Sequence, residues 1–149
     1  MITYQSYFSA ETKKLGKRLA KRVLGHTFQK RAVLIGLVGE LGSGKTTFIQ
    51  GFFQGLGLRR NALSPTFILM RRFGFNNKKF ENLFHIDAYR IKNSREIVRL
   101  GLKEIIKSPQ NIVLIEWADK IKKILPSKII WLEFKHGERE NERIIKIKI

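Results

Sequence analysis

One segment of the sequence limits the fold of this chain more than any other. Residues 31–38 form an almost entirely apolar run, and a glycine-rich segment, 39–44, follows it directly. Such a run is typical of a strand buried on both faces, as in a parallel sheet. A helix is predicted over 45–56, and Gly55 and Gly57 near its end suit a helix C-terminus. The order of strand, glycine loop and helix predicts an α/β layer fold.

The glycine-rich loop also carries the clearest chemical motif. Residues 39–46 match the pattern G-x-x-x-x-G-K-[ST] at every fixed position. Glycines let successive backbone N–H groups converge on phosphates, and the following helix adds the positive end of its dipole. Lys45 supplies a point charge for the β- and γ-phosphates, and the Thr46 hydroxyl suits a magnesium ion. We therefore expect this P-loop to bind a nucleoside triphosphate; the dinucleotide pattern G-x-G-x-x-G fails at Thr47.

The rest of the chain alternates between predicted helices and strands. A helix is expected over 9–24, capped by Ser9, because apolar residues recur at four-residue steps. Further helices are expected over 94–100, capped by Ser94, and over 102–107 and 118–125, and strands over 66–73, 80–86, 111–116, 128–134 and 143–149. We predict a single domain, residues 1–149, built as a three-layer α/β sandwich whose central sheet is mostly parallel with antiparallel edge strands.

Two acidic residues stand where predicted strands end. Glu116 follows the apolar residues 112–115, and Asp87 follows 83–86. Carboxyl ends of strands in an open α/β sheet deliver side chains to the ligand crevice. One carboxylate is expected to hold magnesium, and the other to orient or deprotonate an attacking water. The residues alone leave the division of these roles open.

Three further features allow two interpretations each. The turn Ser64-Pro65-Thr66 suits either a switch that senses the γ-phosphate or the simple start of a strand. Trp117 suits either the core or a cover over the site or over a partner surface. Arg90 suits phosphate or RNA contact, or ordinary solvent exposure.

Composition excludes several classes of protein. Apolar residues make up 43% and charged residues 28% of the 149 residues, which is typical of a folded domain. The chain has no cysteine, so disulfides, thiolate zinc sites and cysteine nucleophiles are excluded. Neither a membrane-spanning apolar run nor a signal-peptide pattern occurs. We therefore expect a cytoplasmic protein that does not contact the membrane.

Positive charge dominates the sequence. Lys and Arg number 30 against 12 Asp and Glu, a net charge of +18. Such a field attracts polyanions, RNA above all, but AT-rich codon usage produces the same bias. The first predicted helix carries a basic stripe that suits either RNA phosphates or a solvated helix face. The stripe consists of Lys13, Lys14, Lys17, Arg18, Lys21 and Arg22.

Four segments together resemble one known family. They are the P-loop with its following residues, 39–48, then Ser64-Pro65-Thr66-Phe67, the run 85–90 (His-Ile-Asp-Ala-Tyr-Arg) and the run 114–117 (Leu-Ile-Glu-Trp). In order and spacing they resemble the bacterial TsaE (YjeE) family, over nearly the whole chain. Phe67 departs from the tyrosine that is frequent in the family.

The resemblance implies an activity and partners. Members of the family are magnesium-dependent ATPases, slow on their own, that are required for threonylcarbamoyladenosine (t6A) formation in tRNA. They dock on a complex of the transferase TsaD with its partner TsaB, and ATP hydrolysis resets that complex. Direct contact with tRNA is left open by the charge.

The resemblance also implies site residues. The ATP-binding set comprises Gly42, Ser43, Gly44, Lys45, Thr46, Thr47 and the switch residue Thr66, with Glu11 or Thr12 near the base and Arg143 as a looser match. Thr46 and Glu116 are implied as magnesium ligands. Asp87 and Lys45 are implied as the catalytic residues, with Trp117 near the site.

Two other functions remain as alternatives. A small-molecule kinase of the P-loop class needs an arginine-bearing lid over the phosphates, which Arg95 and Arg99 could imitate. An RNA-binding module without catalysis needs only the basic surface.

Overall fold

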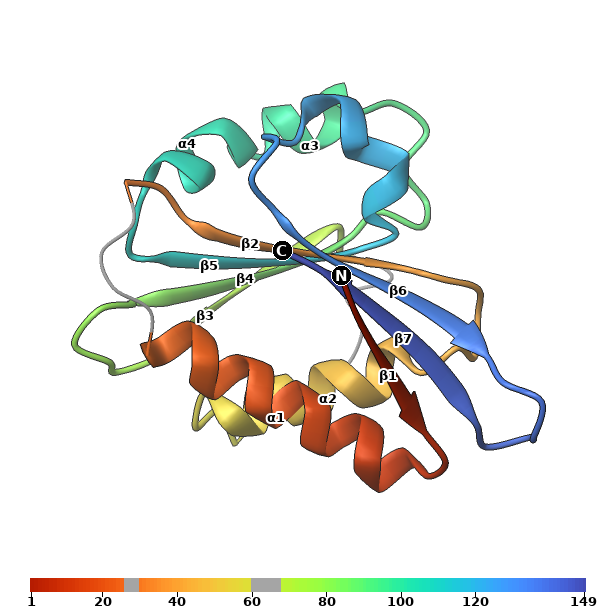
Figure 1. Ribbon diagram of the computed structural model, residues 1–149. Helices are drawn as coiled ribbons and strands as arrows, with labels where there is room; N and C mark the ends of the chain where they lie inside the picture. Colours follow the sequence, from red (N-terminus) through yellow and green to blue (C-terminus); the bar gives the residue numbers. More distant parts are fainter. Residues whose placement is uncertain (26–29, 60–67) are drawn as a thin grey trace. The chain divides into compact units, whose positions relative to one another are not determined.

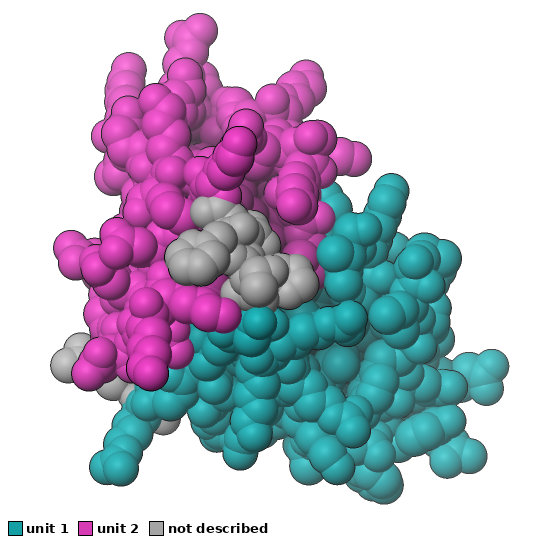
Figure 2. All heavy atoms as spheres, turned by 60° about the vertical axis from the view of Figure 1, so that its left-hand side comes forward, with its two compact units in different colours: residues 1–26, 38–64, 131–149 teal, residues 27–37, 65–130 magenta. Residues whose placement is uncertain are grey.

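The computed structural model describes residues 1–25, 30–59 and 68–149 (Figure 1). The chain folds into two compact units, each assembled from separated stretches of sequence (Figure 2). Unit 1 comprises Met1–His26, Val38–Ser64 and Trp131–Ile149, and unit 2 comprises Thr27–Leu37 and Pro65–Ile130. That residues 1–149 form one ATPase domain stays a prediction. Among the described residues, no helix has the length and apolar character needed to cross a membrane.

Unit 1 contains three antiparallel strands in the order β1-β7-β6. β6 (Ile130–His136) and β7 (Arg143–Lys148) form the expected hairpin, within two residues of the predicted bounds. β1 (Ile2–Ser6) pairs with β7 and was not predicted. Its sequence mixes polar and apolar residues over only five positions, so it carries little strand signal on its own.

Two helices of unit 1 lie side by side (Figure 1). α1 (Ser9–Gly25) and α2 (Lys45–Gly55) each match the predicted helix to within one residue. Ser9 is the first residue of α1 and not its cap: the Phe8 carbonyl accepts the Thr12 N–H, while the Glu11 carboxylate accepts the Tyr7 N–H. The predicted Ser9 cap is therefore wrong, because the carbonyl that accepts the first helical hydrogen bond belongs to Phe8, one residue earlier.

Glycines bring the backbones of α1 and α2 into contact. A Cβ atom on Gly51 would lie 2.0 Å from the Lys13 carbonyl oxygen, and one on Gly16 would lie 2.2 Å from the Phe48 carbonyl oxygen. Neither obstacle is a flexible side chain, so a larger residue at either position must separate the helices.

Gly51→Ala is therefore expected to destabilise the protein. Overpacking of this kind costs about 1–3 kcal/mol and lowers Tm by roughly 3–10 °C in a chain of this size. Gly25→Ala is the matched control, since nothing lies within 4 Å of a Cβ atom there. Thermal unfolding of both variants checks the prediction, and equal melting temperatures would contradict it.

Unit 2 contains the parallel strands. β2 (Val33–Val38), β5 (Asn111–Glu116) and β4 (Asn82–Asp87) run parallel, and β3 (Met70–Gly74) pairs antiparallel with β4, in the order β2-β5-β4-β3. All six residues of β5 are buried, as the apolar run 112–115 at its centre predicts. The strand expected over 66–73 begins at Met70 within the described residues; 66 and 67 lie outside them.

Short helices cover one face of these strands in Figure 1: α3 (Arg95–Arg99) and α4 (Leu102–Lys107). The bounds of α4 are as predicted. Ser94 occupies the cap position of α3, but its side chain makes no capping hydrogen bond. The predicted cap position is therefore confirmed, but the side-chain bond expected of a serine cap is not formed. The Asn93 side-chain oxygen accepts the Arg95 N–H at 3.0 Å, in a turn that leads into the helix.

The segment expected to be helical over 118–125 is a 3₁₀ helix, η1 (Ala118–Ile124). Trp117, directly before it, has left-handed backbone angles (φ 55°, ψ 41°), and Ile121 within it is not helical. The predicted helical segment is therefore 3₁₀ and interrupted at Ile121, and not a regular α-helix.

Candidate functional site

The P-loop of unit 1 adopts the backbone that its glycines permit. Gly42 (φ 73°) and Gly44 (φ 101°) both have left-handed backbone angles, which L side chains rarely adopt. The Phe48 N–H donates to the Gly44 carbonyl at 2.9 Å, so α2 begins directly out of the loop. The local sequence thus produces a tight turn that opens into a helix N-terminus, the arrangement that binds phosphate groups.

Lys45 is held over this loop by the loop's own carbonyl groups. Its Nζ donates to Gly39 O at 2.6 Å and to Glu40 O at 2.8 Å, and lies 3.4 Å from Ser43 Oγ. Lys45 is 5% exposed and Ser43 is fully buried. The ammonium group is thereby fixed beside the glycine backbone. A bound polyphosphate could replace one of the carbonyl groups as the acceptor of its hydrogen bonds.

Arg143, at the start of β7, lies against the same loop. Its Nη2 donates to Gly42 O at 3.1 Å, and its Nη1 donates to the carbonyls of Glu140 and Glu142 at 2.8 Å each. A Cβ atom on Gly44 would lie 3.6 Å from the Arg143 side chain. The structure therefore brings Arg143, 101 positions away from Gly42 in the chain, to the predicted binding loop.

Glu11 and Thr12 occupy the junction of β1 and α1. The Thr12 hydroxyl is buried and lies 2.8 Å from Ser6 Oγ, and Glu11 accepts the Tyr7 N–H at 2.6 Å. Both side chains thus fix the entry to α1. Within the described residues, no hydrogen bond joins either side chain to the P-loop.

Glu142 anchors the β6–β7 turn from which Arg143 extends. Its carboxylate accepts hydrogen bonds from the Gln5 side-chain amide and, at 3.1 Å, from the Arg139 N–H. These two hydrogen bonds, that from Gln5 first, hold the pKa of Glu142 below its usual value of 4.5.

Because the pKa of Glu142 is lowered in the folded protein, its contribution to stability is full above pH 4.5 and is lost as the pH falls through the folded-state value. Glu142→Gln keeps the side-chain size and removes the charge. We expect its free energy of unfolding to fall less between neutral and acidic pH than that of the wild type. Urea unfolding at both pH values measures this, and Glu138→Gln on the same turn is the control. Identical pH dependence in all three proteins would contradict the prediction.

Unit 2 brings the two predicted carboxylates side by side. In the parallel register Glu116 is paired with Asp87 on one side and with Leu37 on the other. Glu116 is 3% exposed and Asp87 is 5% exposed. Both acids therefore stand at the carboxyl ends of adjacent strands of unit 2.

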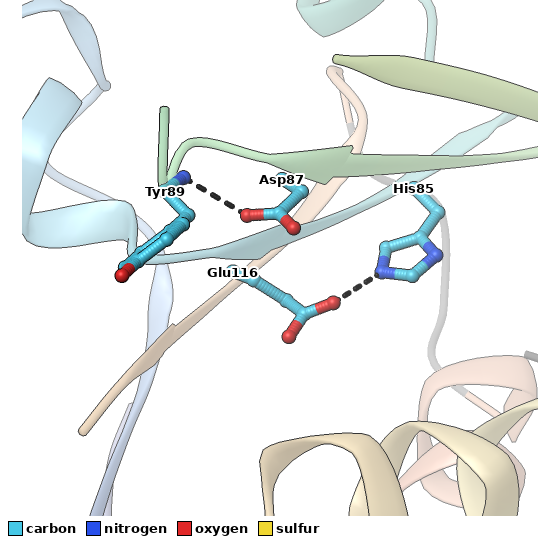
Figure 3. A network of polar contacts seen from close by, with 4 residues as sticks. All are labelled: His85, Asp87, Tyr89 and Glu116. Atoms are coloured by element: carbon cyan, nitrogen blue, oxygen red, sulfur yellow. Dashed lines mark hydrogen bonds and ion pairs between the residues drawn. The ribbon is translucent and has the colours of Figure 1, made fainter. Parts of the chain in front are cut away.

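A histidine that the sequence analysis did not assign to the site contacts Glu116. His85 Nε2 lies 2.9 Å from Glu116 Oε1, and both side chains are buried (Figure 3). His85 precedes Asp87 by two residues on β4 and so projects from the same face of the strand. The two-residue spacing of His85 and Asp87 in the sequence indicates that they share a face of β4. That His85 lies beside Glu116 follows only from the register of β4 against β5.

The segments that follow Asp87 and Glu116 contact each other through their side chains. Asp87 Oδ1 accepts the Tyr89 N–H at 2.9 Å (Figure 3), and the Tyr89 ring packs on the Trp117 ring with centroids 5.0 Å apart. Lys120 Nζ lies 5.1 Å from the Tyr89 centroid and donates to the Tyr89 carbonyl. Trp117 is therefore half-buried against Tyr89 and not in the core, while Arg90 is exposed.

Each unit contains residues of a kind that binds magnesium. In unit 1, Thr46 and Thr47 follow Lys45 at the start of α2, with Thr46 exposed; in unit 2, Glu116 and Asp87 offer carboxylate oxygens. Magnesium prefers such oxygen ligands, takes only one or two from the protein and completes its shell with water and phosphate. The switch residue Thr66, with Ser64, Pro65 and Phe67, lies outside the described residues.

A left-handed glycine loop with an enclosed lysine, following a buried parallel strand and opening a helix, defines a P-loop nucleoside triphosphatase fold. A model of one family within this class, "Threonylcarbamoyl adenosine biosynthesis protein TsaE", matches residues 7–145. The chain belongs to the TsaE family, whose members take part in the biosynthesis of t6A in tRNA.

Individual relatives agree with this assignment. The chain is 37% identical to the tRNA threonylcarbamoyladenosine biosynthesis protein TsaE of Bacillus subtilis, covering 89% of this chain and 77% of that protein. It is 35% identical to TsaE of Haemophilus influenzae, covering 76% and 68%. The crystal structure of Bacillus subtilis YdiB superposes with a TM-score of 0.75 at 29% identity, covering 98% of this chain and 83% of that one. The predicted α/β P-loop fold, with its mostly parallel sheet and antiparallel edge strands, is confirmed.

Proposed function

We propose that this protein is a magnesium-dependent ATPase that serves t6A formation in tRNA. The observation that carries the proposal is the position of Lys45. Its ammonium group is fixed beside a glycine-rich turn that leads directly into the N-terminus of α2. Binding a triphosphate needs a fixed positive charge and converging N–H donors, and this loop has the residues for both. Membership of the TsaE family supplies the pathway.

Each predicted site residue receives a role in the proposal. The backbone of 42–47 and the Lys45 ammonium bind the phosphates, with Arg143 beside them and Thr66 as the switch. Glu11 or Thr12 lies towards the base. Thr46 and Glu116 hold magnesium, which neutralises charge on the phosphates. Asp87 orients or deprotonates the attacking water.

His85 adds a positioning role. By donating to one oxygen of Glu116 at 2.9 Å, it fixes the carboxylate and leaves the second oxygen for the metal. The hydrogen bond fixes the orientation of the Glu116 carboxylate before a metal ion binds. Hydrogen bonds of this kind commonly orient metal-binding side chains.

The proposed partners follow from the pathway. We expect docking on a TsaD-like transferase with its TsaB-like subunit in the cytoplasm, with hydrolysis resetting that complex between turnovers. The two compact units are expected to act as one ATPase domain. The kinase alternative gains no support from α3, because this five-residue helix is anchored by the fully buried Ile97.

Phosphate release from Mg-ATP tests the proposal, measured for the protein alone and with the TsaD–TsaB complex of the same organism. We expect slow release alone and at least a tenfold increase with the complex, about 1.4 kcal/mol of added transition-state stabilisation. Chelation of magnesium should abolish both rates. Failure to bind ATP at all, or phosphate transfer to a small molecule in place of water, would overturn the proposal.

A further inference from the structure

The outer side of α1 carries a regular pattern of positive charge. Basic residues occur in adjacent pairs, one pair per helical turn, and at 100° per residue they fill one half of the helix circumference. The opposite half is the buried one, with Leu15, Leu19 and Val23 in the core. We call the charged half the α1 basic face: Lys13, Lys14, Lys17, Arg18, Lys21 and Arg22.

Within α1 and α2, both of which the structure describes, no acidic side chain pairs with this face. Glu11, the acid in the first turn of α1, accepts the Tyr7 N–H, and α2, which packs on α1, contains no acid. Of the ion pairs formed among the described residues, none includes a side chain of the α1 basic face. Five of its six residues are exposed, and Lys13 is half-buried.

The pattern works against the stability of the helix itself. Lys13, Lys17 and Lys21 form one row at four-residue steps, and a second row of three basic residues runs beside it. Like charges at this spacing repel each other and destabilise an isolated helix. A bound polyanion would remove that repulsion.

Composition bias does not account for the face. Codon bias acts on the whole chain, so on its own it would deplete acids from every exposed helix alike. The helices of unit 2 are of mixed charge: Arg95 is followed by Glu96, and Lys103 by Glu104. Within one chain, therefore, acids are interspersed on α3 and α4 but are missing from the exposed turns of α1.

We propose that the α1 basic face binds the sugar-phosphate backbone of a structured RNA. Neighbouring side chains in each row are about 5–6 Å apart, and both Lys and Arg bind phosphate oxygens. The helix has no aromatic side chain on which bases could stack, so the contact is to the backbone and carries little sequence preference. The inference goes beyond ATP hydrolysis, which requires no RNA contact.

The test is the affinity for an in vitro transcribed tRNA, without nucleotide, at a series of salt concentrations. The variant carries Lys17→Gln, Arg18→Gln, Lys21→Gln and Arg22→Gln. If all four residues neutralise phosphates, the slope of log affinity against log salt becomes shallower by about 3, and affinity near 0.1 M salt falls more than tenfold. Fluorescence anisotropy of labelled tRNA measures both quantities.

A second variant provides a control matched in charge: Arg95→Gln, Arg99→Gln, Lys103→Gln and Lys107→Gln on the mixed-charge helices of unit 2. It removes two lysines and two arginines, as the first variant does, and is expected to leave the slope nearly unchanged. Equal losses in both variants would show that only net charge matters and would overturn the proposal.

Other outcomes are equally decisive. Failure of the wild type to bind tRNA would overturn the proposal, as would a variant that binds tRNA normally but loses the TsaD–TsaB complex, since the face would then bind an acidic protein. Circular dichroism and ATP affinity confirm that the variant is folded. The milder pair Lys17→Gln and Lys21→Gln should show about half the change in slope. ATP turnover is measured separately, so failure of the ATPase proposal is distinguishable from failure of this one.

Discussion

Lys45→Ala is expected to weaken ATP binding on the order of 100-fold, equivalent to about 2.7 kcal/mol. The wild-type ammonium group is buried and fixed by two carbonyl acceptors of its own loop, so it meets the triphosphate with little loss of side-chain freedom. Alanine removes the charge and also leaves the Gly39 and Glu40 carbonyls without this donor. Calorimetric titration with Mg-ATP measures the loss.

A second substitution separates charge from shape at this position. Lys45→Met keeps the length of the side chain, so it should fill the same space over the loop while failing to bind phosphate. Lys103→Ala, an exposed lysine on α4, is the control and should bind as the wild type does. If Lys45→Ala and Lys45→Met both bound ATP with wild-type affinity, the proposed function would be wrong.

Elements with a strong local signal could be predicted from the sequence. β5 and α4 have their predicted bounds, and α2 ends within one residue of them, because unbroken apolar runs and glycines at the ends carry the information locally. β1 could not be predicted, because its strand state depends on pairing with β7 at the other end of the chain. Of the two predicted serine caps, Ser9 lies inside α1, because the first helical hydrogen bond already goes to the Phe8 carbonyl, and Ser94 holds the cap position without forming the side-chain bond.

The site residues likewise divide into those that a local sequence pattern predicts and those that depend on contacts between distant segments. Lys45 and its loop form a continuous segment whose geometry follows from its glycines, so a sequence motif is enough to find it. Arg143 reaches Gly42 from a distant hairpin, and only the resemblance to a family indicated it. The contact of His85 with Glu116 depends on the parallel register of β4 and β5, which no local pattern specifies.

Glu116→Gln is expected to reduce ATP hydrolysis on the order of 100-fold or more while the protein stays folded. Glutamine keeps an oxygen that can accept from His85 Nε2, so the buried contact at 2.9 Å can be retained. What is lost is the negative charge proposed to hold magnesium. The variant should therefore need a higher magnesium concentration for half-maximal turnover, which phosphate release at increasing magnesium measures.

Asp87→Asn completes the experiment, because it separates the two roles that the sequence leaves open. Asp87 ends the strand beside Glu116, and its Oδ1 accepts the Tyr89 N–H, a bond that asparagine can also form. If Asp87 acts on the attacking water, its loss lowers kcat while the magnesium requirement stays that of the wild type. The reverse pattern, a raised magnesium requirement for Asp87→Asn and an unchanged one for Glu116→Gln, would exchange the roles of the two carboxylates. Wild-type turnover in both variants would remove them from the mechanism, since two buried acids at adjacent strand ends would then serve the fold alone.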